Sequence, residues 1–233
     1  MSDPFPTLDL IRHRLEDLGS ERVWRPVPGP DGNLLARGNG PAPAELDGIL
    51  DGLDLRDKSV ADLGANLGYF SFLASRRGAH RVLGLDIDPE VVAVAGLLAR
   101  LHGLGNVAFA TVDFLASPPR RPCDLALLVD FIGRAVVRKG KLPAVVAAAT
   151  AWGAREIFFT LREVYPLDEL GMSADAMTAL YPGTVRDGLF FTIDAVTDLL
   201  GPDWTRRPVA GDGPEAGFCW RHEKTPALFV RRT

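Results

Sequence analysis

Carboxylates and glycines near residue 60 follow a pattern suited to binding a nucleotide. Residues 60–70 read Val-Ala-Asp-Leu-Gly-Ala-Asn-Leu-Gly-Tyr-Phe. A short apolar strand carries Asp62 near its end, and Gly64 and Gly68 lie in the turn that opens the next helix. Glycine lets a ligand approach the backbone closely and adopts a positive φ at little cost. Asn66 stands where a third glycine is common, and asparagine tolerates positive φ better than most residues.

Further carboxylates follow the next strands of the sequence. Asp86 ends the second strand, where a carboxylate can accept two hydrogen bonds from a ribose diol. Asp113 follows the third strand and can accept a hydrogen bond from an adenine amine. Asp130 follows the fourth. Because open α/β sheets bind ligands at the carboxyl ends of their strands, these acids are expected at one binding edge.

The elements that must position these acids alternate along the chain. Apolar runs bounded by turn residues predict strands, and amphipathic or alanine-rich stretches between them predict helices. The expected strands are 59–63, 81–86, 106–111, 124–129 and 155–161, and the expected helices are 69–77, 89–102 and 141–152. Repeated strand–helix units predict an α/β fold, with a Rossmann-like, doubly wound sheet that is mostly parallel.

The flanking segments differ from this pattern. Residues 7–18 have helical apolar spacing with Thr7 as N-cap, 25–43 are rich in glycine and proline, and a short helix is expected over 44–52. Residues 163–191 lack strong periodicity. A helix over 192–200 and β-like runs at 204–209 and 226–231 predict an antiparallel hairpin at the C-terminal edge of a seven-stranded sheet. We therefore expect a helical and irregular cap over 1–56 and a main domain over 57–233, with a substrate-side insertion at 163–191.

The sequence resembles the class I S-adenosylmethionine-dependent methyltransferases, chiefly over residues 57–162. The pattern Asp62-x-Gly64-x-x-x-Gly68 is similar to the first motif of that family, and the expected C-terminal hairpin is similar to its distinguishing edge strands. Asn66 departs from the family glycine. The wording Asp-Leu-Gly-Ala-Asn-Leu-Gly-Tyr-Phe-Ser also resembles the FkbM-type O-methyltransferases and the enzymes that carboxymethylate wobble uridine in tRNA. Neither of these finer resemblances extends beyond this segment.

The resemblance implies S-adenosylmethionine as cofactor and S-adenosylhomocysteine as product. Asp62 then contacts the methionine amino group, Asp86 the ribose and Asp113 the adenine; for Asp62 and Asp113 the alternative is a capping role. Tyr69 and Ile87 either contact the cofactor or pack beside it. The implied cofactor-binding residues are Asp62, Gly64, Ala65, Asn66, Gly68, Tyr69, Phe70, Asp86, Ile87, Asp113, Phe114 and Asp130.

Candidates for catalysis and acceptor binding are fewer. Asp130 and His222 are the residues that we would test as catalytic, His222 as a general base, although Asp130 is equally suited to capping. Substrate contacts are expected from Arg162, at the ligand-binding end of the fifth strand, and from three aromatic residues of the variable segments, namely Tyr165, Tyr181 and Trp220. The alternative role of the aromatic residues is to close a lid.

The composition of the chain limits the classes of molecule that the protein is expected to bind. The net charge is −4, with 26 Lys and Arg against 30 Asp and Glu, which disfavours a protein whose main task is to grip a nucleic-acid backbone. The two cysteines have no metal-ligand spacing, so no metal site is expected. The sequence contains no apolar run long enough to cross a membrane and no readable signal peptide, so a cytoplasmic location is expected. The sequence leaves the oligomeric state open.

Three functions remain in competition. The first is transfer of a methyl group to a small organic acceptor at oxygen or nitrogen. The second is modification of tRNA or rRNA by a methyltransferase, or by a transferase using a derivative of S-adenosylmethionine. This second function is disfavoured by the acidic balance and by Asp-Phe-Ile-Gly at 130–133, where an Asn-Pro-Pro-Tyr type motif is absent. The third is a non-catalytic protein that retains the nucleotide pocket.

Overall fold

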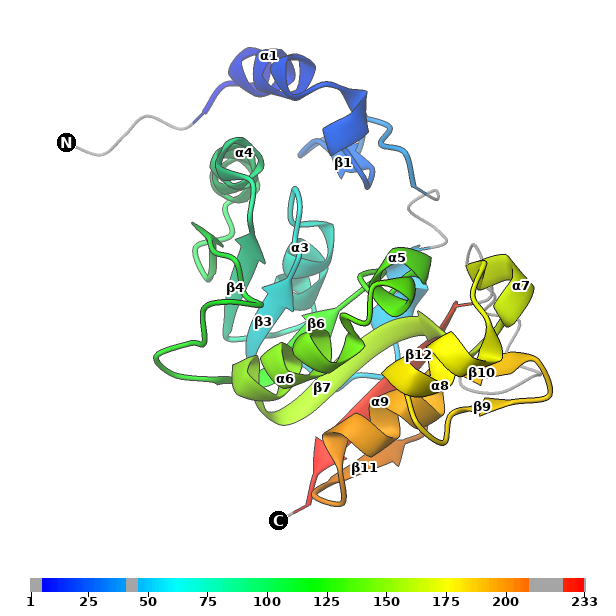
Figure 1. Cartoon of the computed structure of the whole chain (residues 1–233). Coiled ribbons are helices and arrows are strands. Elements are labelled where there is room, and N and C mark those ends of the chain that lie inside the picture. Colours follow the sequence, from blue (N-terminus) through cyan, green and yellow to red (C-terminus); the bar gives the residue numbers. More distant parts are fainter. Residues whose placement is uncertain (1–5, 41–45, 210–223, 233) are drawn as a thin grey trace. The chain divides into compact units, whose positions relative to one another are not determined.

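The computed structural model describes residues 6–40, 46–209 and 224–232. The chain divides into two compact units, Met1–Ser117 and Pro118–Thr233. The main sheet has seven strands in the order β11-β12-β7-β6-β3-β4-β5 (Figure 1). Smaller sheets are formed by β1-β2 and by β8-β10-β9. The fold is therefore α/β with a mostly parallel sheet, as the alternation of strands and helices predicts.

The first unit contains the strand–helix repeats that carry the glycine loop. Its parallel strands are β3 (Ser59–Leu63), β4 (Arg81–Asp86) and β5 (Val107–Thr111), and its helices are α3 (Tyr69–Arg76) and α4 (Pro89–Leu101). Helix α4 begins after Asp88, whose carboxylate accepts hydrogen bonds from the N–H groups of Glu90 and Val91. Pro89 occupies the first turn, where no N–H donor is needed. These bounds confirm the prediction within one residue at each end.

An N-terminal layer packs on α4. It comprises α1 (Leu8–Leu18), the 3-10 helix η1 (Ser20–Arg22), β1 (Val27–Pro28) and β2 (Leu34–Ala36). The 3-10 helix η2 (Asp47–Leu50) follows and contacts α3 through the hydrogen bond between Asp47 and Tyr69. The hydroxyl of Thr7 caps α1 by accepting a hydrogen bond from Leu10 N. The buried face of α1 joins a core with α4 that includes Ile11, Leu15, Leu18, Val94 and Leu98. The N-terminal segment is thus an integral layer of the first unit.

Gly84 in β4 makes room for an aromatic ring of the next strand. A Cβ atom at this position would lie 2.4 Å from Cδ1 and Cε1 of Phe109, which itself packs edge-on against Phe72. We expect Gly84→Ala to lower the free energy of unfolding by roughly 1–3 kcal/mol, because the ring must shift within a packed layer. Urea denaturation measures the change.

A matched glycine in the same unit provides the control for this substitution. A Cβ atom at Gly96, inside α4, would meet nothing within 4 Å, so Gly96→Ala should leave stability unchanged or raise it by up to about 1 kcal/mol. Adding Phe109→Leu to Gly84→Ala should recover part of the loss. Equal stability of the two alanine variants would contradict the steric explanation.

The second unit holds the remaining strands of the main sheet. Its strands are β6 (Cys123–Leu128), β7 (Gly153–Arg162), β11 (Trp204–Arg207) and β12 (Lys224–Arg231), and its helices include α5 (Arg134–Arg138), α6 (Leu142–Trp152) and α9 (Thr192–Leu200). Strand β6 is parallel to β7, whereas β12 is antiparallel to both β7 and β11. Helices α6 and α9 pack against β7 and against each other (Figure 1). The predicted C-terminal antiparallel pair is confirmed.

Residues 163–191 are more regular than their sequence suggests. They form β8 (Val164–Pro166), α7 (Leu167–Leu170), α8 (Ala174–Leu180), β9 (Val185–Arg186) and β10 (Leu189–Phe191). Strand β10 pairs with both β8 and β9, and Phe190 at its centre is fully buried. The placement of an acceptor in this insertion, and the domain boundary at residues 56 and 57, stay predictions.

Candidate cofactor site

The glycine loop between β3 and α3 is held by backbone hydrogen bonds to β4. The N–H groups of Gly64 and Ala65 both donate to the carbonyl oxygen of Leu85, at 2.9 and 2.8 Å. Positive φ angles occur at Gly64 (81°), Asn66 (49°) and Gly68 (86°). The expectation that Asn66 replaces a glycine without disturbing the turn is therefore consistent with the structure.

Asp62 is a buried carboxylate beneath this loop. Its side chain accepts a hydrogen bond of 2.6 Å from the hydroxyl of Ser71 in α3. Burial raises the pKa of Asp62 to about 6, the Ser71 hydrogen bond opposes that rise, and the nearby charge of Asp86 adds to it. The carboxyl group of Asp62 therefore changes between its neutral and ionised forms near pH 6.

Asp86 lies at the carboxyl end of β4 and is partly exposed. Its Oδ2 atom accepts a hydrogen bond from the N–H of Asn66 at 2.9 Å, and its Oδ1 atom accepts one from the N–H of Asp88 at 3.1 Å. A carboxylate has about four lone-pair positions, so each oxygen can accept a further hydrogen bond. The side chain is thus fixed in place and retains acceptor capacity.

The residues after β4 and β5 differ in exposure. Ile87, next to Asp86, is 68% exposed, which is unusual for a large apolar side chain in the described part of this unit. Asp113 is exposed, and its carboxylate accepts a hydrogen bond from Leu115 N at 3.1 Å. Phe114 is buried. Ile87 and Asp113 are therefore accessible to a ligand, whereas Phe114 is not.

The aromatic pair that opens α3 is engaged in packing. The hydroxyl of Tyr69 donates to Oδ1 of Asp47 at 2.7 Å, and burial together with this hydrogen bond raises the pKa of Tyr69. Phe70 is buried and meets the Tyr69 ring edge-on. The structure therefore supplies the packing alternative for both rings, and their contact with a cofactor stays a prediction.

Asp130 belongs to the second unit, after β6, and has a positive φ of 60°. Its N–H donates to Oγ1 of Thr160 at 2.7 Å, and its carboxylate forms an ion pair with the ammonium of Lys224. Strained backbone of this kind occurs often at functional sites. Sequence reasoning missed Lys224; its one signal was a lysine two residues before a β-like run, in a chain with only four lysines.

Of the predicted acceptor residues, Arg162 and Tyr165 lie together. The guanidinium of Arg162 pairs with Glu169 at 2.6 Å, and its Cζ atom lies 5.0 Å from the centre of the Tyr165 ring. Tyr165 and Tyr181 are buried, and the Tyr181 hydroxyl donates to the carbonyl of Val137 at 2.9 Å. Tyr181 is therefore engaged in packing, and acceptor contact by these three residues stays a prediction. Trp220 and His222 lie outside the described residues.

Two further properties of the described residues bear on the site. Within residues 6–40, 46–209 and 224–232, no group of three or more histidine, cysteine or acidic side chains is placed to hold a metal ion. No helix in these ranges combines the length and apolar character required to cross a bilayer.

Solved structures with the same architecture include methyltransferases. The magnesium protoporphyrin IX methyltransferase of Synechocystis, with bound S-adenosylhomocysteine, matches with a TM-score of 0.53 and 18% identity over 81% of this chain and 80% of that one. The bifunctional kinase-methyltransferase WbdD matches with a TM-score of 0.60 and 16% identity over 97% of this chain and 46% of that one. The chain has the class I methyltransferase fold.

Sequence comparison points to the same class of protein. A ribosomal protein L11 methyltransferase of Actinobacillus succinogenes is 31% identical over 159 residues, which are 64% of this chain and 47% of the relative. The chain thus spans less than half the length of this relative. No protein-family model matches the chain. The finer resemblance to the FkbM type stays a prediction.

Proposed function

We propose that the protein is an S-adenosylmethionine-dependent methyltransferase that transfers a methyl group to a small organic acceptor at oxygen or nitrogen. The observation that carries the proposal is Asp86, a carboxylate fixed by two backbone N–H groups beside the glycine loop, with free acceptor positions. The methyltransferase fold and the sequence relatives support it.

The side chains of the first unit suit the chemistry of the cofactor. A ribose diol offers two donors to Asp86, and the methionine ammonium is a cation that an ionised Asp62 can attract. The exposed side chain of Ile87 offers an apolar surface to an adenine ring, and Asp113 is available to its amine. These four residues are the ones we assign to cofactor binding.

When bound, S-adenosylmethionine supplies a methyl group already activated on its sulfonium. The remaining task of the chain is to align the acceptor with that methyl group and to exclude water. An oxygen acceptor also requires a base for its proton. Asp130 is the candidate within the described residues, and Lys224 would hold its carboxylate in position.

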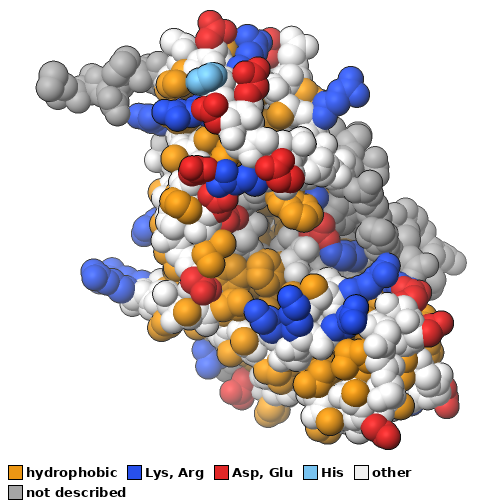
Figure 2. Space-filling model, turned by 45° about the horizontal axis from the view of Figure 1, so that its top comes forward, with side chains coloured by type: hydrophobic (Ala, Val, Ile, Leu, Met, Phe, Trp, Pro, Cys, Tyr) orange, Lys and Arg blue, Asp and Glu red, His pale blue; other side chains and the backbone are white. Residues whose placement is uncertain are grey.

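Two observations bear on the acceptor. The magnesium protoporphyrin IX methyltransferase is named for a small organic acceptor and shares the fold over four-fifths of both chains. The similarity to ribosomal protein L11 methyltransferases favours a ribosomal protein as the second candidate acceptor. Basic and acidic side chains both occur across the face shown in Figure 2, so that face lacks the uniformly basic surface typical of nucleic-acid binding.

Calorimetric titration with S-adenosylhomocysteine tests the cofactor assignment. Saturable one-site binding is expected, and no binding up to millimolar ligand would refute it. Radiolabelled methyl transfer to hydroxylated and amine small molecules, to ribosomal protein L11 and to bulk RNA then separates the acceptors. Binding without any transfer would support the non-catalytic alternative, whereas salt-dependent RNA binding with transfer would support the nucleic-acid alternative.

The affinity for S-adenosylhomocysteine should rise with pH through the pKa of Asp62. This pKa is about 6, so the carboxylate that attracts the ammonium is mostly protonated at pH 5 and ionised at pH 7.5. We expect affinity roughly 10-fold higher at pH 7.5 than at pH 5, measured calorimetrically. Asp62→Asn should bind weakly with a flat pH profile.

The raised pKa of Asp62 affects the stability of the fold in the opposite direction to its effect on affinity. The folded-state pKa of Asp62 lies above its unfolded value, so its contribution to stability is present below about pH 4 and is lost as pH rises through about 6.

Ser71→Ala removes the hydrogen bond that lowers the pKa of Asp62 and should move the binding curve to higher pH. A wild-type affinity that is constant from pH 5 to 7.5 would rule out ionised Asp62 as the ammonium partner.

A further inference from the structure

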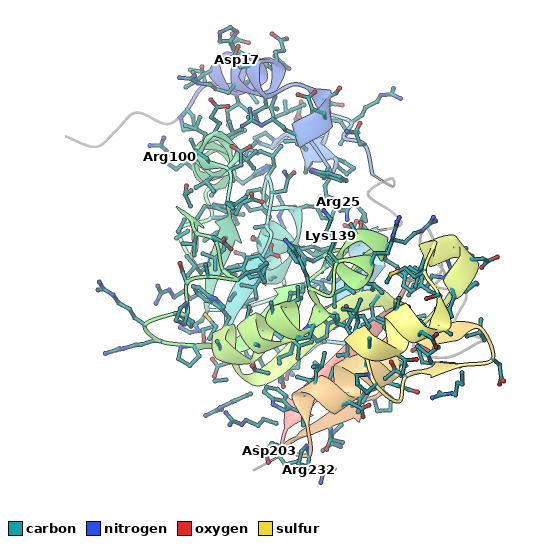
Figure 3. The ribbon with its side chains drawn as sticks, viewed as in Figure 1. Asp17, Arg25, Arg100, Lys139, Asp203 and Arg232 are labelled. Carbon is teal, nitrogen blue, oxygen red and sulfur yellow. The ribbon has the colours of Figure 1, made fainter. Side chains whose placement is uncertain are left out.

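We propose that residues 22–24, here called the tether, set the affinity of the cofactor site by holding the two loops that flank Asp86, with Arg22 and Asn66 as positioning residues. This inference rests on the proposed function, because it assigns a role to the N-terminal layer in cofactor binding. The tether begins at Arg22, the last residue of η1, and precedes β1; Arg25, labelled in Figure 3, immediately follows it.

The carboxylate of Asp86 accepts hydrogen bonds from two loops, the glycine loop and the turn before α4. Its Oδ2 atom accepts from the N–H of Asn66 in the glycine loop, and its Oδ1 atom accepts from the N–H of Asp88 in the turn before α4. A change in the spacing of these loops would therefore move the carboxylate that we assign to the ribose.

Arg22 forms hydrogen bonds to the same two loops. Its carbonyl oxygen accepts a hydrogen bond of 2.9 Å from Nδ2 of Asn66. Its guanidinium donates to both oxygens of Asp88, with Nε to Oδ2 at 2.9 Å and Nη2 to Oδ1 at 2.6 Å, and to Glu90 at 2.6 Å. Bidentate pairing of this kind fixes geometry as well as charge. Arg22 thus connects the glycine loop to the N-terminus of α4.

Asn66 has a side chain suited to this connection. Besides donating to Arg22, it accepts a hydrogen bond of 3.3 Å from the N–H of Trp24 through Oδ1. A glycine would adopt the same positive φ but would lose both hydrogen bonds. The departure from the family glycine therefore has a structural reason: the side chain attaches the N-terminal layer to the loop.

The other side of the tether is also bound within the first unit. The carbonyl of Val23 accepts from the N–H of Asn39 at 2.9 Å, and Nδ2 of Asn39 donates to the carbonyl of Ser20 at 2.6 Å. The tether is thus fixed between two parts of the unit. If the tether raises the affinity for the cofactor by a given factor, the bound cofactor must favour the ordered tether by the same factor, because coupling between two sites is reciprocal.

Hydrogen exchange of the full chain, with and without S-adenosylhomocysteine, tests the inference together with calorimetry. We expect the ligand to slow exchange of the amides of residues 20–24 in the wild type. Asn66→Gly should bind about 10-fold more weakly and lose this ligand-dependent protection, although its fold is retained. Arg22→Gln should act in the same direction, and the double variant should lose less than the two single effects combined.

Arg12→Gln is the matched control, because it removes an exposed arginine–aspartate pair in α1 that has no link to Asp86. It should leave affinity and protection unchanged. Wild-type affinity in Asn66→Gly, or weaker affinity with the protection of residues 20–24 intact, would overturn the tether while leaving the proposed function in place. Absence of ligand binding by the wild type would refute the proposed function, and the tether with it.

Discussion

Asp86→Ala should weaken binding of S-adenosylhomocysteine at least about 100-fold. The substitution removes the carboxylate that we assign to the ribose diol, and charge-assisted hydrogen bonds contribute roughly 1.5–3 kcal/mol each. It also leaves the N–H groups of Asn66 and Asp88 without their acceptor, so both flanking loops lose their common partner. Calorimetry at pH 7.5 measures the affinity.

Controls separate ligand contact from loss of structure. Asp54→Ala removes an exposed carboxylate that pairs with the neighbouring Arg56, and it should not change the affinity. Asp113→Ala should have a smaller effect than Asp86→Ala, about 10-fold, because exposed Asp113 is assigned one hydrogen bond to the cofactor and Asp86 is assigned two. Unchanged affinity in Asp86→Ala, with the fold intact by circular dichroism, would show that the cofactor assignment is wrong.

The parts of the fold that could be predicted are those that local sequence determines. Strand β4 and helix α4 illustrate this: an apolar run ends at Asp86, and Asp88 and Pro89 supply the cap and first turn of the helix. Both signals act within a few residues. The same holds for Thr7 before α1.

The regular structure of residues 163–191 could not be predicted in the same way. Strands β8 and β10 have three residues each and are stabilised by pairing with one another, from Val164 with Phe191 to Pro166 with Leu189. Three residues are too few for a periodic pattern, and the partner is distant in sequence. Only the tertiary structure reveals that these glycine- and proline-containing segments are ordered as strands.

The acidic residues of the candidate site could be predicted from the sequence, whereas the residues that hold them in place could not. Asp62 and Asp86 follow from their places in or after strands, whereas Arg22 contacts Asp88 across 66 residues of sequence. The positive φ of Asn66 was expected from its residue type, but its link to the tether was not. Likewise, Lys224 reaches Asp130 across 94 residues, because β12 runs antiparallel to β7. Long-range pairs of this kind leave no local signal.

Lys224→Met should lower the free energy of unfolding by about 2–3 kcal/mol. Lys224 is almost fully buried, and its ammonium is paired with the carboxylate of Asp130, which is about one-quarter exposed. Removing one member of a buried ion pair leaves the other charge without that compensation, which costs 3–5 kcal/mol at fully buried sites. The partial exposure of Asp130 reduces the expected value. Urea denaturation at pH 7 measures it.

A double variant distinguishes the ion pair from the packing of the lysine stem. Asp130→Asn removes the charge that Lys224→Met leaves behind, so the double variant should be more stable than Lys224→Met alone. Lys139→Met, at an exposed lysine in the same unit, is the matched control and should change stability by less than about 0.5 kcal/mol. If Asp130→Asn fails to restore stability to Lys224→Met, the loss arises from packing. The carboxylate of Asp130 would then not depend on Lys224 for its position after β6, and its proposed role as a base would lack this support.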